Sequence, residues 1–271
     1  MSKPLFPWQV KTDPGLPFHQ PSINVVGEWL VAKMMVARSI KRAFAGVYIY
    51  AEPQALRITR AEMPILFCVT HSGWYDGYLT YVINKAIFRR AGYLMMEEAN
   101  LKRYPFLTWV GVFGVDRDDA RKALQGINYI SARLTQERST LWMFPQGTIT
   151  HPDARPLKLF GGVASIARRV GGCAIVPIAV RYELGLEQSP NVYMRVGGPI
   201  LLRPEEQQLS SREITSMLTT AMTETADKLH EDVMSIVRPR YRKILAGKGS
   251  VNKVWDQALQ ILNQLRGRNV E

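Results

Sequence analysis

The sequence predicts an α/β fold in which a central mixed sheet is flanked by helices. Short β-rich apolar runs alternate with segments of helical periodicity, and hydrophobic residues make up 46% of the chain, enough for a substantial core. Strands that alternate with helices are typical of α/β sheets, whose functional sites lie at the strand ends. The 271 residues allow one large domain or two small ones, and no obvious linker divides them.

Residues 1–50 are expected to form a leader and a helix that associates with the membrane. Residues 1–21 are rich in proline and lack the apolar core of a signal peptide. Residues 23–50 carry apolar side chains at helical spacing, interrupted by basic ones, which predicts one long amphipathic helix. Such a helix either lies in the membrane interface or packs on the core with a solvated basic face. Its basic residues are Lys33, Arg38, Lys41 and Arg42.

Residues 51–210 are expected to form the catalytic domain around the sheet. The expected strands are residues 65–70, 93–96, 110–116, 140–144, 174–182 and 192–200. The expected helices begin near Asp76, after a cap at Asp118 or Asp119, and at Val163. Residues 211–271 are expected to form a C-terminal helical segment. Its two helices cover residues 212–237 and 251–265, with a strongly basic stretch between them.

The composition restricts the function classes. The formal charge of +12 favours anionic partners such as phospholipid headgroups, nucleic acid, or an acidic cofactor or carrier. Two cysteines build neither a disulfide framework nor a zinc site, and four histidines without HExxH predict no metal centre. No apolar stretch reaches the ~18 residues of a spanning helix. We therefore expect a cytoplasmic protein that is peripheral on the inner face of the membrane.

A histidine and an aspartate follow the first expected strand of the sheet. In "THSGWYD", His71 precedes Asp76 by five residues across a turn at a strand end. Histidine takes a proton at neutral pH, and a nearby carboxylate fixes its tautomer. His71 is therefore a candidate general base and Asp76 its orienting partner. By itself the H-x4-D spacing is common, and a buried histidine beside an acid explains it better.

Three further blocks follow in order: "GVFGVDR" (111–117), "FPQGTIT" (144–150) and "IVPIA" (175–179). In this order and spacing the four blocks resemble those of the glycerolipid acyltransferase superfamily, the lysophosphatidate and glycerol-phosphate acyltransferases. The family blocks read roughly NHxxxxD, GxxFIDR, FPEGTRS and VPxxI. The resemblance spans about residues 65–200. It implies a single acyltransferase domain at the membrane surface, which moves an acyl chain from acyl-CoA or acyl carrier protein to a hydroxyl and needs no other cofactor.

The resemblance assigns roles to individual residues. His71 becomes the general base that deprotonates the acceptor hydroxyl, and Asp76 its orienter. Arg117 matches the arginine that binds the acceptor's phosphate, although a surface ion pair with a neighbouring aspartate explains it almost as well. Backbone N–H groups around Gly147 are candidate donors to the oxyanion. Because no GxSxG motif is present, direct transfer without an acyl-enzyme is the simpler mechanism.

Three positions depart from the family blocks. Thr70 replaces asparagine, Gln146 replaces glutamate, and Ile149 stands where arginine is common. Isoleucine does not bind phosphate, so a neutral or glycosylated acceptor such as a carotenoid glycoside is plausible, with a lysophospholipid as the other choice. The expected substrate contacts, beside Arg117, are Gln146, Gly147, Thr148, Arg155 and Lys158, the last two for the carrier's phosphates.

Two other functions compete with this interpretation. A basic nucleic-acid-binding protein would explain the charge but not the four ordered blocks, and no nucleic-acid-binding signature is present. A catalytically inactive family member that binds lipid would explain Gln146. The expected partners are therefore an acyl thioester, a lipid acceptor and an anionic membrane surface, without nucleic acid.

Overall fold

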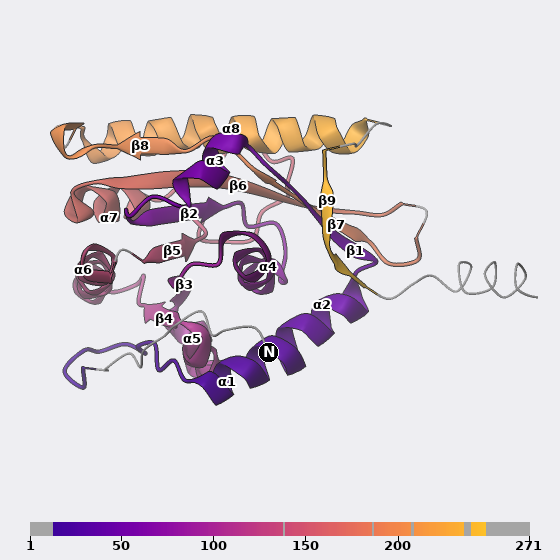
Figure 1. Cartoon of the computed structure of the whole chain (residues 1–271). Coiled ribbons are helices and arrows are strands. Elements are labelled where there is room, and N and C mark those ends of the chain that lie inside the picture. The colour runs from indigo at the N-terminus through magenta and orange to yellow at the C-terminus, as the bar shows by residue number, and fades with distance from the viewer. Residues whose placement is uncertain (1–12, 138, 186, 207–208, 236–239, 248–271) are drawn as a thin grey trace, which may run out of the picture.

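The computed structural model describes residues 13–137, 139–185, 187–206, 209–235 and 240–247 (Figure 1). A nine-stranded sheet forms its centre, in the order β4-β3-β5-β2-β6-β7-β1-β9, with β8 paired to β6 off this path. The strands are β1 (Gly46–Ala51), β2 (Ile65–Val69), β3 (Gly92–Glu97), β4 (Val112–Val115), β5 (Thr140–Met143), β6 (Cys173–Glu183), β7 (Asn191–Val196), β8 (Ile200–Leu202) and β9 (Arg242–Ala246). The predicted α/β class with a mixed central sheet is confirmed.

The helices flank this sheet. The α-helices are α1 (Val25–Leu30), α2 (Arg38–Ala43), α3 (Pro53–Ile58), α4 (Asp76–Ile83), α5 (Glu98–Arg103), α6 (Ala120–Glu137), α7 (Gly162–Val170) and α8 (Ser211–Met234). The π- and 3₁₀-helical segments are η1 (Val31–Ala37), η2 (Asn84–Phe88), η3 (Pro105–Val110) and η4 (Pro204–Glu206). Figure 1 shows α6 and α4 on opposite sides of the strands β5, β3 and β4.

The mixed sheet has a parallel part that positions the site. Strands β4, β3, β5, β2 and β6 run parallel to one another, whereas β7 and β8 pair antiparallel with β6. The carboxyl ends of β2, β3, β4 and β5 therefore lie along one edge of the sheet. In open α/β sheets this edge is where ligands bind.

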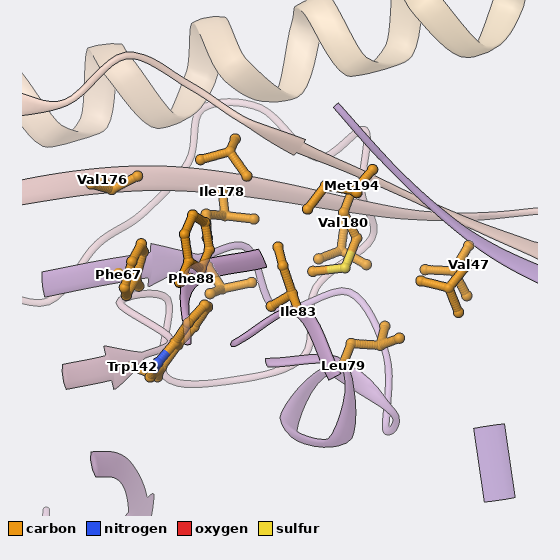
Figure 2. Packing of buried hydrophobic residues seen from close by; sticks show 14 of the residues in the cluster. Val47, Phe67, Leu79, Ile83, Phe88, Trp142, Val176, Ile178, Val180 and Met194 are labelled. Carbon is orange, nitrogen blue, oxygen red and sulfur yellow. The ribbon is translucent and has the colours of Figure 1, made fainter. Parts of the chain in front are cut away.

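Successive side chains of the buried strands point to opposite faces of the sheet, so each face has its own hydrophobic core. In β2, Leu66 and Cys68 belong to the cluster under α6, α7 and α8, whereas Ile65, Phe67 and Val69 belong to the cluster under α4. This is the period of two that a strand buried on both faces requires. Figure 2 shows the second cluster, in which Phe67 and Trp142 stack with their ring centroids 4.2 Å apart.

The predicted helix over residues 23–50 is wrong in its last quarter. Helical structure ends at Ala43, Phe44 is extended, and residues 46–51 form β1 in the sheet. The segment "GVYIYA" is rich in β-branched and aromatic residues, which favour a strand once neighbouring strands are present to pair with them. This pairing with β7 and β9 is a long-range contact that helical periodicity does not report.

The helical part of this N-terminal segment packs on the core, which is one of the two alternatives considered for it, and its outer face is exposed. Val31, Val36 and Ile40 are buried in the core, and buried Glu28 pairs with Lys85 of η2 at 2.8 Å. The outer face exposes large apolar side chains together with basic ones. The exposed residues are Val25, Val26, Trp29, Leu30, Lys33, Arg38, Lys41 and Arg42. None of the helices in the described ranges is both long and apolar enough to cross a bilayer.

The C-terminal segment departs from the expected all-helical arrangement. Helix α8 begins with a capping box between Ser210 and Glu213, and the basic stretch after it contains strand β9. The predicted strand 192–200 is two strands, β7 and β8, separated by "GGP". The predicted helix 251–265 lies outside the described residues. Strands from all three expected segments, 1–50, 51–210 and 211–271, thus share one sheet.

Candidate active site

His71 and Asp76 meet at the carboxyl end of β2. His71 lies in the loop after the strand, and Asp76 is the first residue of α4. The Nδ1 atom of His71 is 2.8 Å from Oδ2 of Asp76, which also accepts hydrogen bonds from the backbone N–H groups of Ser72 and Gly73. The Asp76 side chain is fully buried, whereas the His71 side chain is 22% exposed.

These bonds determine the histidine tautomer. An ionised carboxylate only accepts hydrogen bonds, and backbone N–H groups directed at it stabilise the charged form. Nδ1 of His71 therefore carries the proton and donates it to Asp76, which leaves Nε2 as the acceptor. A proton acceptor on a partly exposed ring is the arrangement that a general base requires.

Tyr182 is a third member of this group. Its hydroxyl donates to Oδ1 of Asp76, the oxygen that His71 does not use. Burial, and then the negative charge of Asp76, raise the pKa of Tyr182 far above its ordinary value of 10.0, so the hydroxyl remains a donor at neutral pH. A Cβ added at Gly73 would lie 2.7 Å from the Tyr182 ring, which explains a glycine in this loop. Sequence analysis missed Tyr182, because 106 residues separate it from Asp76.

The loop after β5 holds His71 from the other side. The ring of Phe144 stacks on the imidazole with 4.5 Å between centroids, and Thr150 N–H donates to the carbonyl of His71 at 2.8 Å. Gln146 is buried. Its Oε1 accepts from the backbone N–H of His71 at 2.8 Å, and its Nε2 donates to Thr150 Oγ1.

Gln146 was expected to contact substrate, and its side-chain amide is instead used to join the two loops. The amide places an acceptor toward His71 and a donor toward Thr150, so an uncharged side chain suits this position. Thr70 has a comparable role: its Oγ1 accepts from Val180 N–H at 3.0 Å and joins the end of β2 to β6. Two of the three departures from the family blocks therefore have a local structural reason.

Arg117 follows β4 and reaches the same loop. Its Nη1 donates to the carbonyl of Gly147 at 2.6 Å, and its guanidinium lies over the ring of Phe160 with 4.8 Å to the centroid. Lys122 pairs with Asp116 and Asp119 in its place. Arg117 therefore joins the loops after β4 and β5, and the ion pair considered for it is absent from the described contacts.

Of the backbone N–H groups around Gly147 that were expected to serve the oxyanion, that of Gly147 itself is already used. Gly147 has a φ of +69°, which favours glycine, and its N–H donates to the carbonyl of Phe144 at 2.9 Å. Thr148 is exposed beside it. The two residues expected to contact the carrier's phosphates, Arg155 and Lys158, lie away from this loop. Arg155 pairs with Asp227 of α8, and Lys158 is exposed. Neither Arg155 nor Lys158 lines the cavity beside His71.

A cavity of about 510 Å³ opens beside His71. Its walls are mainly apolar side chains from η1, α4, β3, η3, β4 and β5, and its volume is within the ~300–1,000 Å³ range of small-molecule sites. The polar lining includes His71, Arg117, Glu97 and Asn100, of which sequence analysis missed the last two. Of the described residues, no three His, Cys, Asp or Glu side chains gather into a metal-binding group.

The comparisons with known proteins found a matching family model and a similar solved structure. Residues 52–181, which contain His71, Asp76 and Arg117, match the family model described as Acyltransferase. This match supports the resemblance to the glycerolipid acyltransferase superfamily, whose reaction takes an acyl donor and a lipid acceptor. Among solved structures it is similar to the 1-acyl-sn-glycerophosphate (LPA) acyltransferase PlsC from Thermotoga maritima, with 15% identity, a TM-score of 0.48, and coverage of 70% of this chain and 73% of that chain. No curated protein sequence matches.

Proposed function

We propose that the protein transfers a fatty acyl group from acyl-CoA or acyl carrier protein to a hydroxyl group of a lipid acceptor. The observation that carries this proposal is the His71–Asp76 pair at the rim of a mainly apolar cavity. An apolar cavity suits the acyl chain, and a base at its rim would face the thioester carbonyl. The match to the family model supports the transfer reaction.

In the proposed reaction Nε2 of His71 removes the proton of the acceptor hydroxyl. The hydroxyl oxygen attacks the thioester carbonyl carbon, a C–O bond forms, and the C–S bond breaks. The leaving thiolate then takes the proton from the imidazolium, so that neither the protein nor the acyl donor changes oxidation state. Asp76 stays ionised and stabilises the transient imidazolium, as a carboxylate beside a catalytic histidine does.

The test is thiol release by the purified full-length chain from acyl-CoA and from acyl carrier protein, with lipid acceptors present and the product identified by mass spectrometry. We expect acceptor-dependent thiol release and acylated product. A catalytically inactive lipid-binding protein would bind the thioester without releasing thiol. That outcome with every acceptor would overturn the proposed function.

We also propose that α1, η1 and α2 attach the protein to the anionic inner face of the membrane. The exposed apolar residues of α1 would enter the interface, and each nearby basic residue contributes about 1 kcal/mol at an anionic surface. Removal of residues 1–50 would also remove β1 from the sheet, so substitutions are the better test. Val26→Asp with Trp29→Asp should reduce co-sedimentation with anionic liposomes, and high salt should reduce it further. Unchanged binding by the double variant would place the attachment elsewhere.

A further inference from the structure

We propose that the rim of the cavity binds an uncharged polyhydroxyl headgroup, that of a glycolipid, through Glu97 and Asn100, and that it disfavours a phosphorylated headgroup. This inference rests on the proposed acyl transfer, since it names the acceptor class of the same site. Glu97 and Asn100 line the cavity and both residues are exposed. They are absent from the four sequence blocks that indicated the family.

The strand order places Glu97 between the other polar residues of the rim. Arg117 follows β4, Glu97 ends β3, and His71 follows β2, with β5 between β3 and β2. Neighbouring strands are about 4.8 Å apart, so the end of β3 is roughly 10 Å from the end of β2. An acceptor whose hydroxyl reaches His71 therefore extends the rest of its headgroup over Glu97. A single sugar ring and its linkage would cover this span.

The chemistry at this point suits hydroxyl groups. Asn100 Nδ2 donates to Glu97 Oε2 at 3.0 Å, which holds the carboxylate in place and uses only one of its oxygens. Carboxylate and amide oxygens accept hydrogen bonds from hydroxyls, and an amide N–H₂ also donates to them. A phosphate at neutral pH offers acceptors almost exclusively. It would meet like charge at Glu97 and no compensating donor from that side chain.

The rim carries one positive and one negative side chain, so its charges balance and it is not a cationic surface. Of the described residues that line the cavity, Arg117 is the only lysine or arginine and Glu97 the only aspartate or glutamate. Arg117 already donates to Gly147 and stacks on Phe160. Ile149, also on the rim and 53% exposed, adds an apolar surface where a second cation would favour phosphate. One engaged cation opposed by one carboxylate is a weak phosphate site.

An exposed aromatic surface completes the rim. Trp74 is 63% exposed and Tyr104 43% exposed, and both line the cavity. Rigid aromatic faces give a ligand apolar contact area, while a few polar groups fix its orientation. A sugar ring offers both kinds of surface, since its C–H faces are apolar and its edge carries hydroxyls.

The experiment measures binding directly, with octyl β-glucoside and octyl phosphate as probes below their critical micelle concentrations. Calorimetric titration of the full chain should give tighter binding of the glucoside. Glu97→Gln keeps the side-chain shape and removes the charge, so it should reduce this preference about tenfold, mainly through tighter binding of octyl phosphate. Glu205→Gln, a neutralisation of an exposed glutamate outside the cavity lining, is the matched control and should leave the preference unchanged.

Three results would overturn the inference: tighter binding of octyl phosphate by the wild type, the same preference in Glu97→Gln, or binding of neither probe. The transfer assay is a separate measurement. Failure of thiol release with every acceptor would overturn the proposed function and leave the binding result to stand. Transfer that favours lysophosphatidate over a glycolipid, with octyl phosphate bound more tightly, would keep the function and reject this acceptor.

Discussion

The chain contains two histidine–carboxylate pairs of almost the same geometry. His71 Nδ1 lies 2.8 Å from Asp76, and His19 Nδ1 lies 2.7 Å from Glu98. In both pairs the carboxylate is buried and also accepts from a backbone N–H, that of His19 itself in the second pair. Distance and burial alone therefore do not separate a reactive pair from a structural one.

The surroundings separate the two pairs. His71 lines the cavity, whereas His19 is not among the described residues that do. The carbonyl of His19 accepts from Gly114 N–H of β4 at 2.9 Å, so this pair fastens the N-terminal segment to the edge of the sheet. In the first pair Tyr182 adds a further bond to the carboxylate. The two pairs therefore differ in their access to the cavity and in the bonds to the carboxylate, and the proposed base is the histidine that lines the cavity.

The largest expected effect is on kcat, and it distinguishes His71 from His19. His71→Ala should lower kcat for acyl transfer by roughly 10²–10⁴-fold, the usual contribution of a general base. His19→Ala, the matched control, should keep kcat near the wild-type value, because it is outside the cavity. Thiol release by the two folded variants, checked by circular dichroism, measures this. A comparable loss of kcat in both variants would show that His71 and His19 do not differ in function.

The second effect, on kcat and on the melting temperature, distinguishes Asp76 from Glu98. Asp76→Asn directs an amide at a cluster of donors and weakens the orientation of His71, so kcat should fall at least tenfold but less than in His71→Ala. Glu98→Gln should lower the melting temperature and leave kcat close to that of the wild type. Parallel thermal and kinetic measurements test this. A loss of kcat in Glu98→Gln as large as that in Asp76→Asn would contradict it.

A third and smaller effect concerns the bond that only the first pair has. Tyr182→Phe removes the donor to Asp76 Oδ1 and concentrates negative charge on the oxygen that faces His71. The network that orients His71 loses one hydrogen bond, so kcat should fall while the protein stays folded. At neutral pH we expect a loss of only about threefold to tenfold. An unchanged kcat in the folded Tyr182→Phe variant would make Tyr182 a packing residue only.

The smallest effect is on stability. His19→Ala removes an ion pair and hydrogen bond in which the histidine side chain is 38% exposed, so a loss of about 1 kcal/mol is expected. In a protein of this size that corresponds to a melting temperature lower by roughly 2–4 °C. Differential scanning calorimetry measures it. A stability equal to that of the wild type would mean that this pair does not fasten the N-terminal segment.

Local sequence patterns determined the fold class, most of the central strands and the pairing of His71 with Asp76. These features depend on periodicity and on contacts within a few residues, which a sequence displays directly. The tertiary structure alone decided which surrounding groups complete the site. Tyr182, Glu97 and the strand β1 obtain their places from pairing between distant segments. The order and direction of the strands decide which distant residues become neighbours. The free energy of strand pairing is spread over many contacts, and no short sequence motif contains them.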